Sequence, residues 1–324
     1  MRLPWEIPDL HSTVDRLLRQ IPRGRVSTAG ALAEALGNRL AAVWVGHYLL
    51  HHRHTDMCPC HRAIRAGGVV GPYIAGGETA KADRLRGEGI PIIAGRIDLG
   101  HCHFDSFVTD RPLQRLAELQ NALASEVELD GPMKAPRTVA GVDVAYPDAE
   151  TAQAAYALVE VQTGSLAWTT TIRCPARFPY IRSYLTFREL PALLGVIEAA
   201  RSAGKLADVV MVDGTGVLHP RRAGIASHLG VVGKLPTVGV TKKSLCGECD
   251  LQGLSLDTPR PVLLGGVTTG AAILPTTGTR RPLYVSPGHL MSVEAAVDVV
   301  RKMLRGRRLP EPIYWADRLS KGGR

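Results

Sequence analysis

The feature that most constrains the fold of this chain is the change after residue 105 from a helical pattern to strand-like segments. Three strand-like runs between residues 138 and 173 follow one another with short polar breaks, which is typical of an antiparallel meander. After them, apolar strands at residues 208–214 and 235–243 alternate with helical segments. A meander followed by strands that alternate with helices predicts an α/β fold, in which helices cover a mixed β-sheet.

The first hundred residues have a helical pattern instead. Two short helices joined through a turn that contains Gly37 form a helix-turn-helix arrangement. The segment "IPIIAGRIDLGHCHF" reads as a junction, so we expect two domains, residues 1–100 and residues 101–324. Helices in the first domain are expected at residues 10–20, 29–37, 39–52 and 81–89.

The charge balance favours a polyanionic partner such as nucleic acid. The chain of 324 residues has 39 Lys and Arg against 30 Asp and Glu, a formal net charge of +9. No apolar run approaches the length that spans a bilayer, and the start "MRLPWEIPDL" lacks the apolar region of a secretory signal. Six cysteines without such a signal indicate a reducing compartment. We therefore expect a cytoplasmic protein that does not engage membranes, and no sequence feature indicates an obligate protein partner.

Acidic residues interrupt or end two of the apolar strands. Asp143 lies inside "VAGVDVAY" and Asp213 ends "VVMVDG". A carboxylate in a buried strand is costly unless it is paired or bound to a metal, and two such acids side by side would form a site for a hard cation. Glu189, at an expected strand-to-helix transition, would supply a third ligand. Spacing alone leaves the alternative open that Asp213 begins a turn and that Asp143 is an ion-pair partner.

The motifs around these acids resemble a known repair nuclease. In chain order they read "GVDVAY", "FPYIRSYLTFRE", "VDGTGVLHPRRAGIASHLGV", "LPTVGVTKKSL" and "YVSPGHLMSVEAA". Together they resemble endonuclease V, which nicks DNA near deoxyinosine, and the resemblance covers about residues 101–322. It implies an RNase H-like fold and a Mg²⁺ site, in which Mn²⁺ can substitute, formed by Asp143, Asp213 and Glu189. It also implies hydrolysis of the second phosphodiester bond 3′ to deoxyinosine.

The resemblance assigns roles to further residues. Lys242 would neutralise charge on the scissile phosphate, and His289 would orient or protonate a group near the metal. Tyr180 corresponds to the family's wedge, which enters the duplex beside the lesion. Gly214 and Gly216 would let backbone amides approach the flipped base, because they carry no Cβ.

One position departs from the endonuclease V pattern. After the Pro-Tyr-Ile of the wedge the family has Pro-Gly, whereas this chain has Arg182 and Ser183. Ser183 adds a side chain where the backbone should approach the lesion, so we expect an altered base pocket or a relaxed specificity. Arg182 would compensate with a phosphate contact.

The first domain resembles a second repair family. Its "IPRGRVSTAGALAEALG", "PCHRAIRAGG" and "LRGEGIPI" resemble the winged helix-turn-helix-like DNA-binding domain of alkylguanine-DNA alkyltransferases, over residues 8–100. In that family the cysteine of Pro-Cys-His-Arg, here Cys60, accepts an alkyl group from guanine. A relay from Cys60 through water to His61 and Glu88 would lower the pKa of the thiol and form a nucleophilic thiolate.

The parts that flip the base in that family are largely missing here. Ala29 replaces the tyrosine that rotates the phosphate, Val43 replaces the arginine finger, and His52 replaces an asparagine. A different chemistry stays open, because His51, His54, Cys58 and Cys60 have spacings that zinc can use. "HCH" at residues 101–103 and "CGEC" at residues 246–249 add further ligands, but no set has the standard four-ligand spacing.

Three functions are therefore compared. The first is an endonuclease whose first domain acts as a DNA-binding clamp, and the second adds suicide alkyl transfer from O6-alkylguanine to Cys60. The third is a non-catalytic protein that binds lesions. The intact set of Asp143, Glu189 and Asp213 argues against the third.

Overall fold

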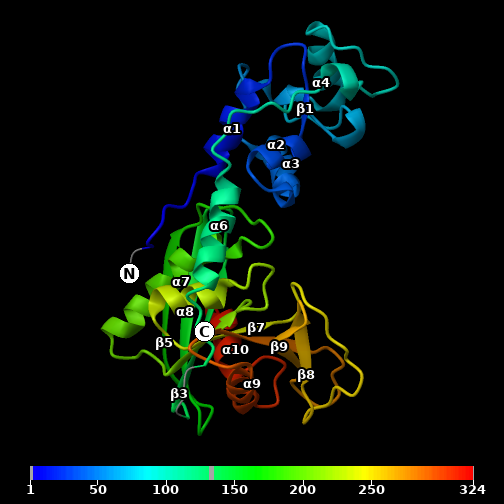
Figure 1. Cartoon of the computed structure of the whole chain (residues 1–324). Coiled ribbons are helices and arrows are strands. Elements are labelled where there is room, and N and C mark those ends of the chain that lie inside the picture. The colour runs from blue at the N-terminus through cyan, green and yellow to red at the C-terminus, as the bar shows by residue number, and fades with distance from the viewer. Residues whose placement is uncertain (1–2, 131–134, 324) are drawn as a thin grey trace. The chain divides into compact units, whose positions relative to one another are not determined.

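The computed structural model describes residues 3–130 and 135–323 and divides the chain into two compact units. The N-terminal unit comprises Ile7–Glu118 and Phe178–Arg182. The C-terminal unit comprises Met1–Glu6, Leu119–Arg177 and Ser183–Arg324. Figure 1 colours the chain from blue at the N-terminus to red at the C-terminus. The predicted boundary between residues 100 and 101 stays a prediction.

One mixed sheet of eight strands organises the C-terminal unit, in the order β5-β4-β3-β6-β7-β10-β9-β8. The central strands β3, β6 and β7 are parallel, and antiparallel strands flank them on both sides. This is the predicted arrangement of a meander followed by alternating strands and helices. The strands are β3 (Thr138–Ala145), β4 (Thr151–Glu160), β5 (Leu166–Pro175), β6 (Val209–Asp213), β7 (Thr237–Thr241), β8 (Arg260–Leu264), β9 (Val267–Ile273) and β10 (Leu283–His289).

Helices cover both faces of this sheet. Ala140 and Val142 of β3 join an apolar core with α7 (Leu185–Ser202) and α8 (Ile225–Gly233). Val139 of β3 joins a second core with α9 (Val293–Lys302) and α10 (Glu311–Ser320). This division follows from the period of two along a strand, which sends successive side chains to opposite faces. Another helix, α6 (Pro112–Ala124), precedes β3 in the chain.

The N-terminal unit contains the predicted helix-turn-helix. Thr28 caps α2 (Ala29–Ala35), because its Oγ1 accepts a hydrogen bond from the amide of Ala31 at 3.0 Å. The chain then turns at Gly37, whose φ of 99° favours glycine, and continues into α3 (Ala42–His51). The other helices are α1 (Leu10–Gln20), α4 (Gly77–Gly87), α5 (Leu99–Cys102) and the 3₁₀ turns η1 (Arg39–Ala41), η2 (Pro59–Arg62) and η3 (Ala66–Gly68). The short strands β1 (Ser27–Thr28) and β2 (Ala63–Ile64) pair in parallel.

The expected helix at residues 10–20 is confirmed, and those at residues 29–37 and 39–52 are shorter or partly 3₁₀ in the structure. Among the described residues, no helix combines the length and apolar character needed to cross a membrane.

Candidate functional site

Two aspartates lie on neighbouring strands, where the parallel pairing of β3 with β6 ends. β3 and β6 are paired with Val142 opposite Val212, and the next residues are Asp143 and Asp213. Neighbouring strands lie about 4.8 Å apart. The spacing of the two acids in the sequence is large, but the strand register brings them to the same edge of the sheet.

Asp143 is a half-buried acid that accepts a hydrogen bond from a serine of α10. The Ser320 hydroxyl at the end of α10 donates a hydrogen bond to Asp143 Oδ2 at 2.7 Å. Burial raises the pKa of the Asp143 carboxyl, and the negative charge of Asp213 raises it further, while the hydrogen bond from Ser320 opposes both effects. The site therefore resists holding two negative charges without a cation.

Glu189 completes this group of acids. Burial raises the pKa of Glu189 to about 8, and the charges of Asp143 and Asp213 act in the same direction. The Tyr146 hydroxyl donates to Glu189 Oε1 at 3.4 Å. The expected strand-to-helix transition at Glu189 is wrong, because α7 begins at Leu185 and continues through Pro191. Glu189 thus projects from the second turn of a helix, and a bound cation would relieve the repulsion among the three carboxylates.

Two lysines partly balance the acids. Lys242, which follows β7, lies with its Nζ 3.1 Å from Asp213 Oδ2, in agreement with its predicted place in this site. The sequence analysis missed Asp317 of α10, whose charge contributes to the raised pKa of Asp143. Lys321 Nζ lies 2.7 Å from Asp317 Oδ1. Asp317 lies on a helix that packs against β3. Local sequence patterns do not reveal which strand a helix packs against.

His289 lies apart from this edge of the sheet. β10 is antiparallel to β7 with His289 opposite Thr237, whereas Asp213 pairs with Val240. The register thus separates His289 from the acids by three positions along β7. Its Nδ1 accepts a hydrogen bond from the amide of Glu128 at 3.2 Å, and burial lowers the pKa of its imidazole. The role of His289 near the metal stays a prediction.

Tyr180 is suited to contact DNA. Its side chain is 67% exposed, so it is not the half-buried core residue that its position after a proline also permits. An exposed aromatic ring can stack on bases beside a flipped nucleotide. Its role as a wedge stays a prediction.

The backbone conformation at Ser183 accounts for the glycine that the endonuclease V family has at this position. The φ of Ser183 is 68°, in the left-handed region that glycine adopts without steric cost. Its carbonyl oxygen accepts hydrogen bonds from Arg221 Nη2 at 2.6 Å, His219 Nε2 at 3.2 Å and Gln120 Nε2 at 3.3 Å. These three donors hold the strained backbone in place.

The amides of Gly214 and Gly216 are already used inside the protein. The Gly214 amide donates to the carbonyl of Val240 at 3.2 Å, and the Gly216 amide donates to Ser286 Oγ at 2.9 Å. A Cβ at Gly216 would collide with the carbonyl of Pro287. Close packing alone therefore requires glycine at residue 216, and the predicted contact of both amides with a flipped base stays a prediction.

The N-terminal unit holds the predicted histidine-glutamate pair. His61 Nε2 lies 2.8 Å from Glu88 Oε1, and Arg62 also donates to this carboxylate. Burial would raise the pKa of Glu88, but the hydrogen bonds from Arg62 and His61 outweigh it and lower the pKa to about 2. His61 Nδ1 is buried and finds no hydrogen-bond partner in the described part of the chain.

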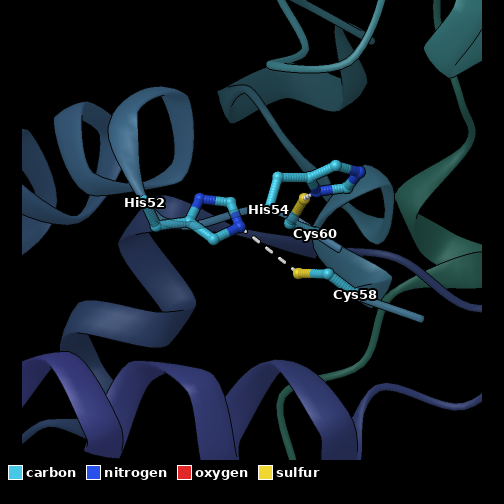
Figure 2. A group of neighbouring side chains, drawn as sticks. All are labelled: His52, His54, Cys58 and Cys60. Carbon is cyan, nitrogen blue, oxygen red and sulfur yellow. Dashed lines mark hydrogen bonds between the residues drawn. The ribbon is translucent and has the colours of Figure 1, made fainter. Parts of the chain in front are cut away.

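Cys60 has a different environment from the one predicted. Its side chain is 3% exposed, and its Sγ lies 3.4 Å from His54 Nδ1 (Figure 2). The hydrogen bond with Cys58 raises the pKa of the Cys60 thiol, and burial raises it further. The same hydrogen bond, opposed by burial and helped by His52, lowers the pKa of the Cys58 thiol to about 5. The expectation of a lowered pKa at Cys60 is therefore wrong, because its neighbour takes the negative charge first.

Val43 and Trp44 lie at and beside the position where the alkyltransferase family has its arginine finger. Val43 is 86% exposed on α3, so a hydrocarbon side chain stands at the surface where the family has its arginine. Trp44 is half-buried and packs its ring against His11 and Tyr48, with centroids 5.4 Å and 5.8 Å away. Trp44 thus belongs to the packing of the unit and does not replace the missing arginine.

Two protein-family models match the chain. The model for Endonuclease V matches residues 121–318, and the model for the DNA binding domain of 6-O-methylguanine DNA methyltransferase matches residues 9–90.

Relatives of known name match either one unit or nearly the whole chain. An endonuclease V of Xanthomonas axonopodis pv. citri is 42% identical over 205 residues, which is 63% of this chain and 85% of that protein. A bifunctional methyltransferase/endonuclease of Picrophilus torridus is 34% identical over 297 residues, 91% of this chain and 90% of that protein. The structure of Ciona intestinalis endonuclease V, in complex with a 24mer DNA containing an inosine followed by a ribo-adenosine, has a TM-score of 0.59 and 25% identity, and the match covers 66% of this chain and 98% of that one.

Proposed function

Because this chain belongs to the endonuclease V family and is a nuclease, we propose that it nicks DNA at deoxyinosine with Mg²⁺ as its metal, at the second phosphodiester bond 3′ to the lesion. The single observation that carries this proposal is the group of acids formed by Asp143 of β3, Asp213 at the end of β6 and Glu189 of α7. Asp143 and Glu189 have raised pKa values there, caused by burial and by the neighbouring acids.

The donor set fits Mg²⁺. Asp143, Asp213 and Glu189 offer carboxylate oxygens, the ligands that this hard cation prefers, and their mutual repulsion is the property that a divalent cation relieves. When bound, Mg²⁺ activates a water and stabilises the leaving oxygen of a phosphodiester. Mn²⁺ has a similar preference for oxygen ligands and is expected to substitute.

The chain's own residues position the substrate and balance its charge. Lys242, now paired with Asp213, can turn its ammonium group to the scissile phosphate once a cation neutralises that acid. The Ser320 hydroxyl holds the Asp143 carboxylate in place through its Oδ2.

Deoxyinosine is supported as the lesion by two observations. The endonuclease V of Ciona intestinalis was captured with inosine-containing DNA. In this chain, the exposed ring of Tyr180 offers a stacking surface that can fill the gap left by a flipped base. Together, these two observations support the proposal that this chain recognises inosine.

Alkyl transfer to Cys60 is the second candidate. It is favoured by the name of the Picrophilus torridus relative and by the pair of His61 and Glu88. The burial and raised pKa of Cys60 weaken it, because the thiolate is the nucleophile.

The test is the nicking of an inosine-containing duplex in Mg²⁺ by the full chain, with mapping of the cut and of its 3′-hydroxyl end. We expect Asp143→Asn and Asp213→Asn to abolish nicking while binding to the inosine duplex persists. Asp257→Asn is the matched control, since this acid of the same unit is 96% exposed. Equal cutting of inosine and undamaged duplexes would contradict the specificity, and full nicking by either variant would remove that acid from the site.

A further inference from the structure

Two histidines and two cysteines meet in the N-terminal unit. His52 directly follows α3, His54 and Cys58 lie in the loop after it, and Cys60 lies in η2. One ligand atom from each of the four side chains lies within 4.8 Å of all the others. Figure 2 shows the four side chains turned toward a common centre.

Two of the distances between ligand atoms match a tetrahedral metal centre. His52 Nε2 lies 3.3 Å from Cys58 Sγ, and His54 Nδ1 lies 3.4 Å from Cys60 Sγ. Zinc bonds of about 2.3 Å to sulfur and about 2.0 Å to nitrogen place tetrahedral ligand atoms about 3.3–3.8 Å apart. Little movement of these two pairs is therefore needed to bind the ion.

Each imidazole is oriented through its other nitrogen. His52 Nδ1 lies 3.2 Å from the carbonyl oxygen of Tyr48, so it donates there and leaves Nε2 free to bind a metal. His54 Nε2 lies 3.5 Å from the Tyr73 hydroxyl, which leaves Nδ1 as the ligand atom. Outer partners of this kind fix the ring and the tautomer of histidines that bind metals.

We propose that His52, His54, Cys58 and Cys60 bind one zinc ion in a closed, tetrahedral structural site. Two thiolates and two neutral imidazoles around a divalent ion carry no net charge, which suits the burial of His52 and Cys60, 6% and 3% exposed. Sulfur and imidazole ligands in this geometry select zinc over Mg²⁺. The proposal does not rest on the nuclease function, because all four ligands belong to the N-terminal unit.

The proposed set of zinc ligands differs in one residue from the set that the sequence suggested. His51 is exposed, its Nδ1 lies 2.8 Å from the carbonyl oxygen of His47, and its ring stacks on His47 at 4.1 Å. His52 takes its place in the cluster. The site also uses Cys60 as a ligand, so the bound protein holds this sulfur away from an alkylated base.

The first experiment measures metal content and ligand type in the full chain. Protein purified with only Mg²⁺ added should contain about one zinc per chain, and Co²⁺ substitution should give a thiolate-to-cobalt charge-transfer band with tetrahedral visible bands. Cys58→Ser and His54→Ala should lower zinc affinity at least 100-fold. The matched controls are Cys102→Ser and His51→Ala, which lie outside the cluster and should keep both zinc and the cobalt spectrum. Zinc content unchanged in Cys58→Ser, or a cobalt spectrum without the charge-transfer band, would overturn the proposal.

The second experiment needs no variant that removes a ligand. Iodoacetamide should label Cys58 and Cys60 slowly in the zinc-loaded protein and at least ten times faster after a chelator removes the ion, as followed by mass spectrometry of the peptide. Tyr73→Phe should weaken zinc binding by about tenfold, because it removes the outer partner of His54. Labelling of Cys60 at one rate with and without zinc would show that this sulfur is not a ligand. Neither readout depends on nicking, so failure here is distinct from failure of the proposed nuclease function.

Discussion

The backbone at Ser183 stores strain that glycine would release. A non-glycine residue in the left-handed region costs about 1–2 kcal/mol, and glycine gives back about 0.4–1 kcal/mol through the greater entropy of its unfolded chain. We predict that Ser183→Gly increases the free energy of unfolding by about 1 kcal/mol, as measured by chemical denaturation. The three hydrogen bonds to the Ser183 carbonyl do not use its side chain and should persist.

A matched variant separates strain from recognition. Lys234 ends α8 with a φ of 53°, so Lys234→Gly should also stabilise the protein. If the Ser183 side chain crowds the base pocket, only Ser183→Gly should also raise the preference for inosine over adenine duplexes. The same preference in both variants would show that the serine is harmless to recognition.

The raised pKa of Glu189 predicts a pH dependence of stability. The pKa of this carboxyl rises from 4.5 to about 8 on folding, so the folded state binds more protons between these values. Stability from this group is complete below pH 4.5 and is lost as the pH rises through about 8. Denaturation of the metal-free protein should therefore become easier from pH 5 to pH 8, and saturating Mg²⁺ should remove most of this loss.

The controls for this dependence lie on one helix. Glu189→Gln should flatten the pH profile, whereas Glu198→Gln, an exposed acid of α7, should leave it intact. A profile that Mg²⁺ does not change would contradict binding of the ion near Glu189.

At the scale of elements, the position of α10 depends on Gly141 of β3. A Cβ at Gly141 would collide with the backbone of Pro312 and Ile313 at the start of this helix. Gly141→Ala should therefore displace α10, which carries Asp317 and Ser320, and should destabilise the protein by about 1–3 kcal/mol, as is typical of overpacking.

Nicking should fall together with this destabilisation, because Ser320 holds Asp143. Gly195→Ala in α7 is the control, since its Cβ would meet Ile172 at an ordinary contact distance of 3.4 Å. Kinetics of nicking and denaturation of both variants measure the effect. Unchanged kinetics in a destabilised Gly141→Ala protein would show that α10 does not position the acids.

The elements also show what the sequence can predict. The mixed sheet followed from local periodicity, and the fold class is confirmed in both parts, as an RNase H-like domain and an alkyltransferase-like DNA-binding domain. The neighbouring positions of Asp143 and Asp213 depend on the register between β3 and β6, because Asp143 lies inside its strand whereas Asp213 ends the other.

Other features depend on information outside local patterns. Asp317 was missed because the strand on which a helix packs is not encoded in the helix. The sequence suggested His51 as a metal ligand, whereas the structure places His52 in the cluster. The difference depends on the residue at which α3 ends, and local sequence patterns locate helix ends poorly. The left-handed backbone of Ser183 could not be predicted, because a serine in the sequence does not indicate that conformation.

At the scale of the whole molecule, the net charge of +9 predicts salt-dependent DNA binding. Arg19 is an exposed residue of α1 that lines the same cavity of the N-terminal unit as Arg53 and Arg84. Arg19→Ala should reduce the slope of log affinity against log salt by about one and weaken inosine and undamaged duplexes equally, as expected for a phosphate contact. The maximal nicking rate on saturating DNA should stay unchanged.

Arg86→Ala is the control for this measurement. Arg86 lies 3.0 Å from Asp83, and a cation that is already paired releases few counterions from DNA. Fluorescence anisotropy titrations at several salt concentrations measure the slopes. An unchanged slope for Arg19→Ala would place the DNA on another face of the protein.

The four histidine and cysteine ligands lie between residues 52 and 60, whereas the acids of the sheet are contributed by residues 143, 189 and 213. Closing a short loop costs little chain entropy, so an unfolded chain can already wrap residues 52–60 around an ion. The acids lie far apart in the sequence, and only the assembled sheet brings them together. The histidine and cysteine site can therefore form early and promote folding, whereas the acidic site can form only after the sheet has folded.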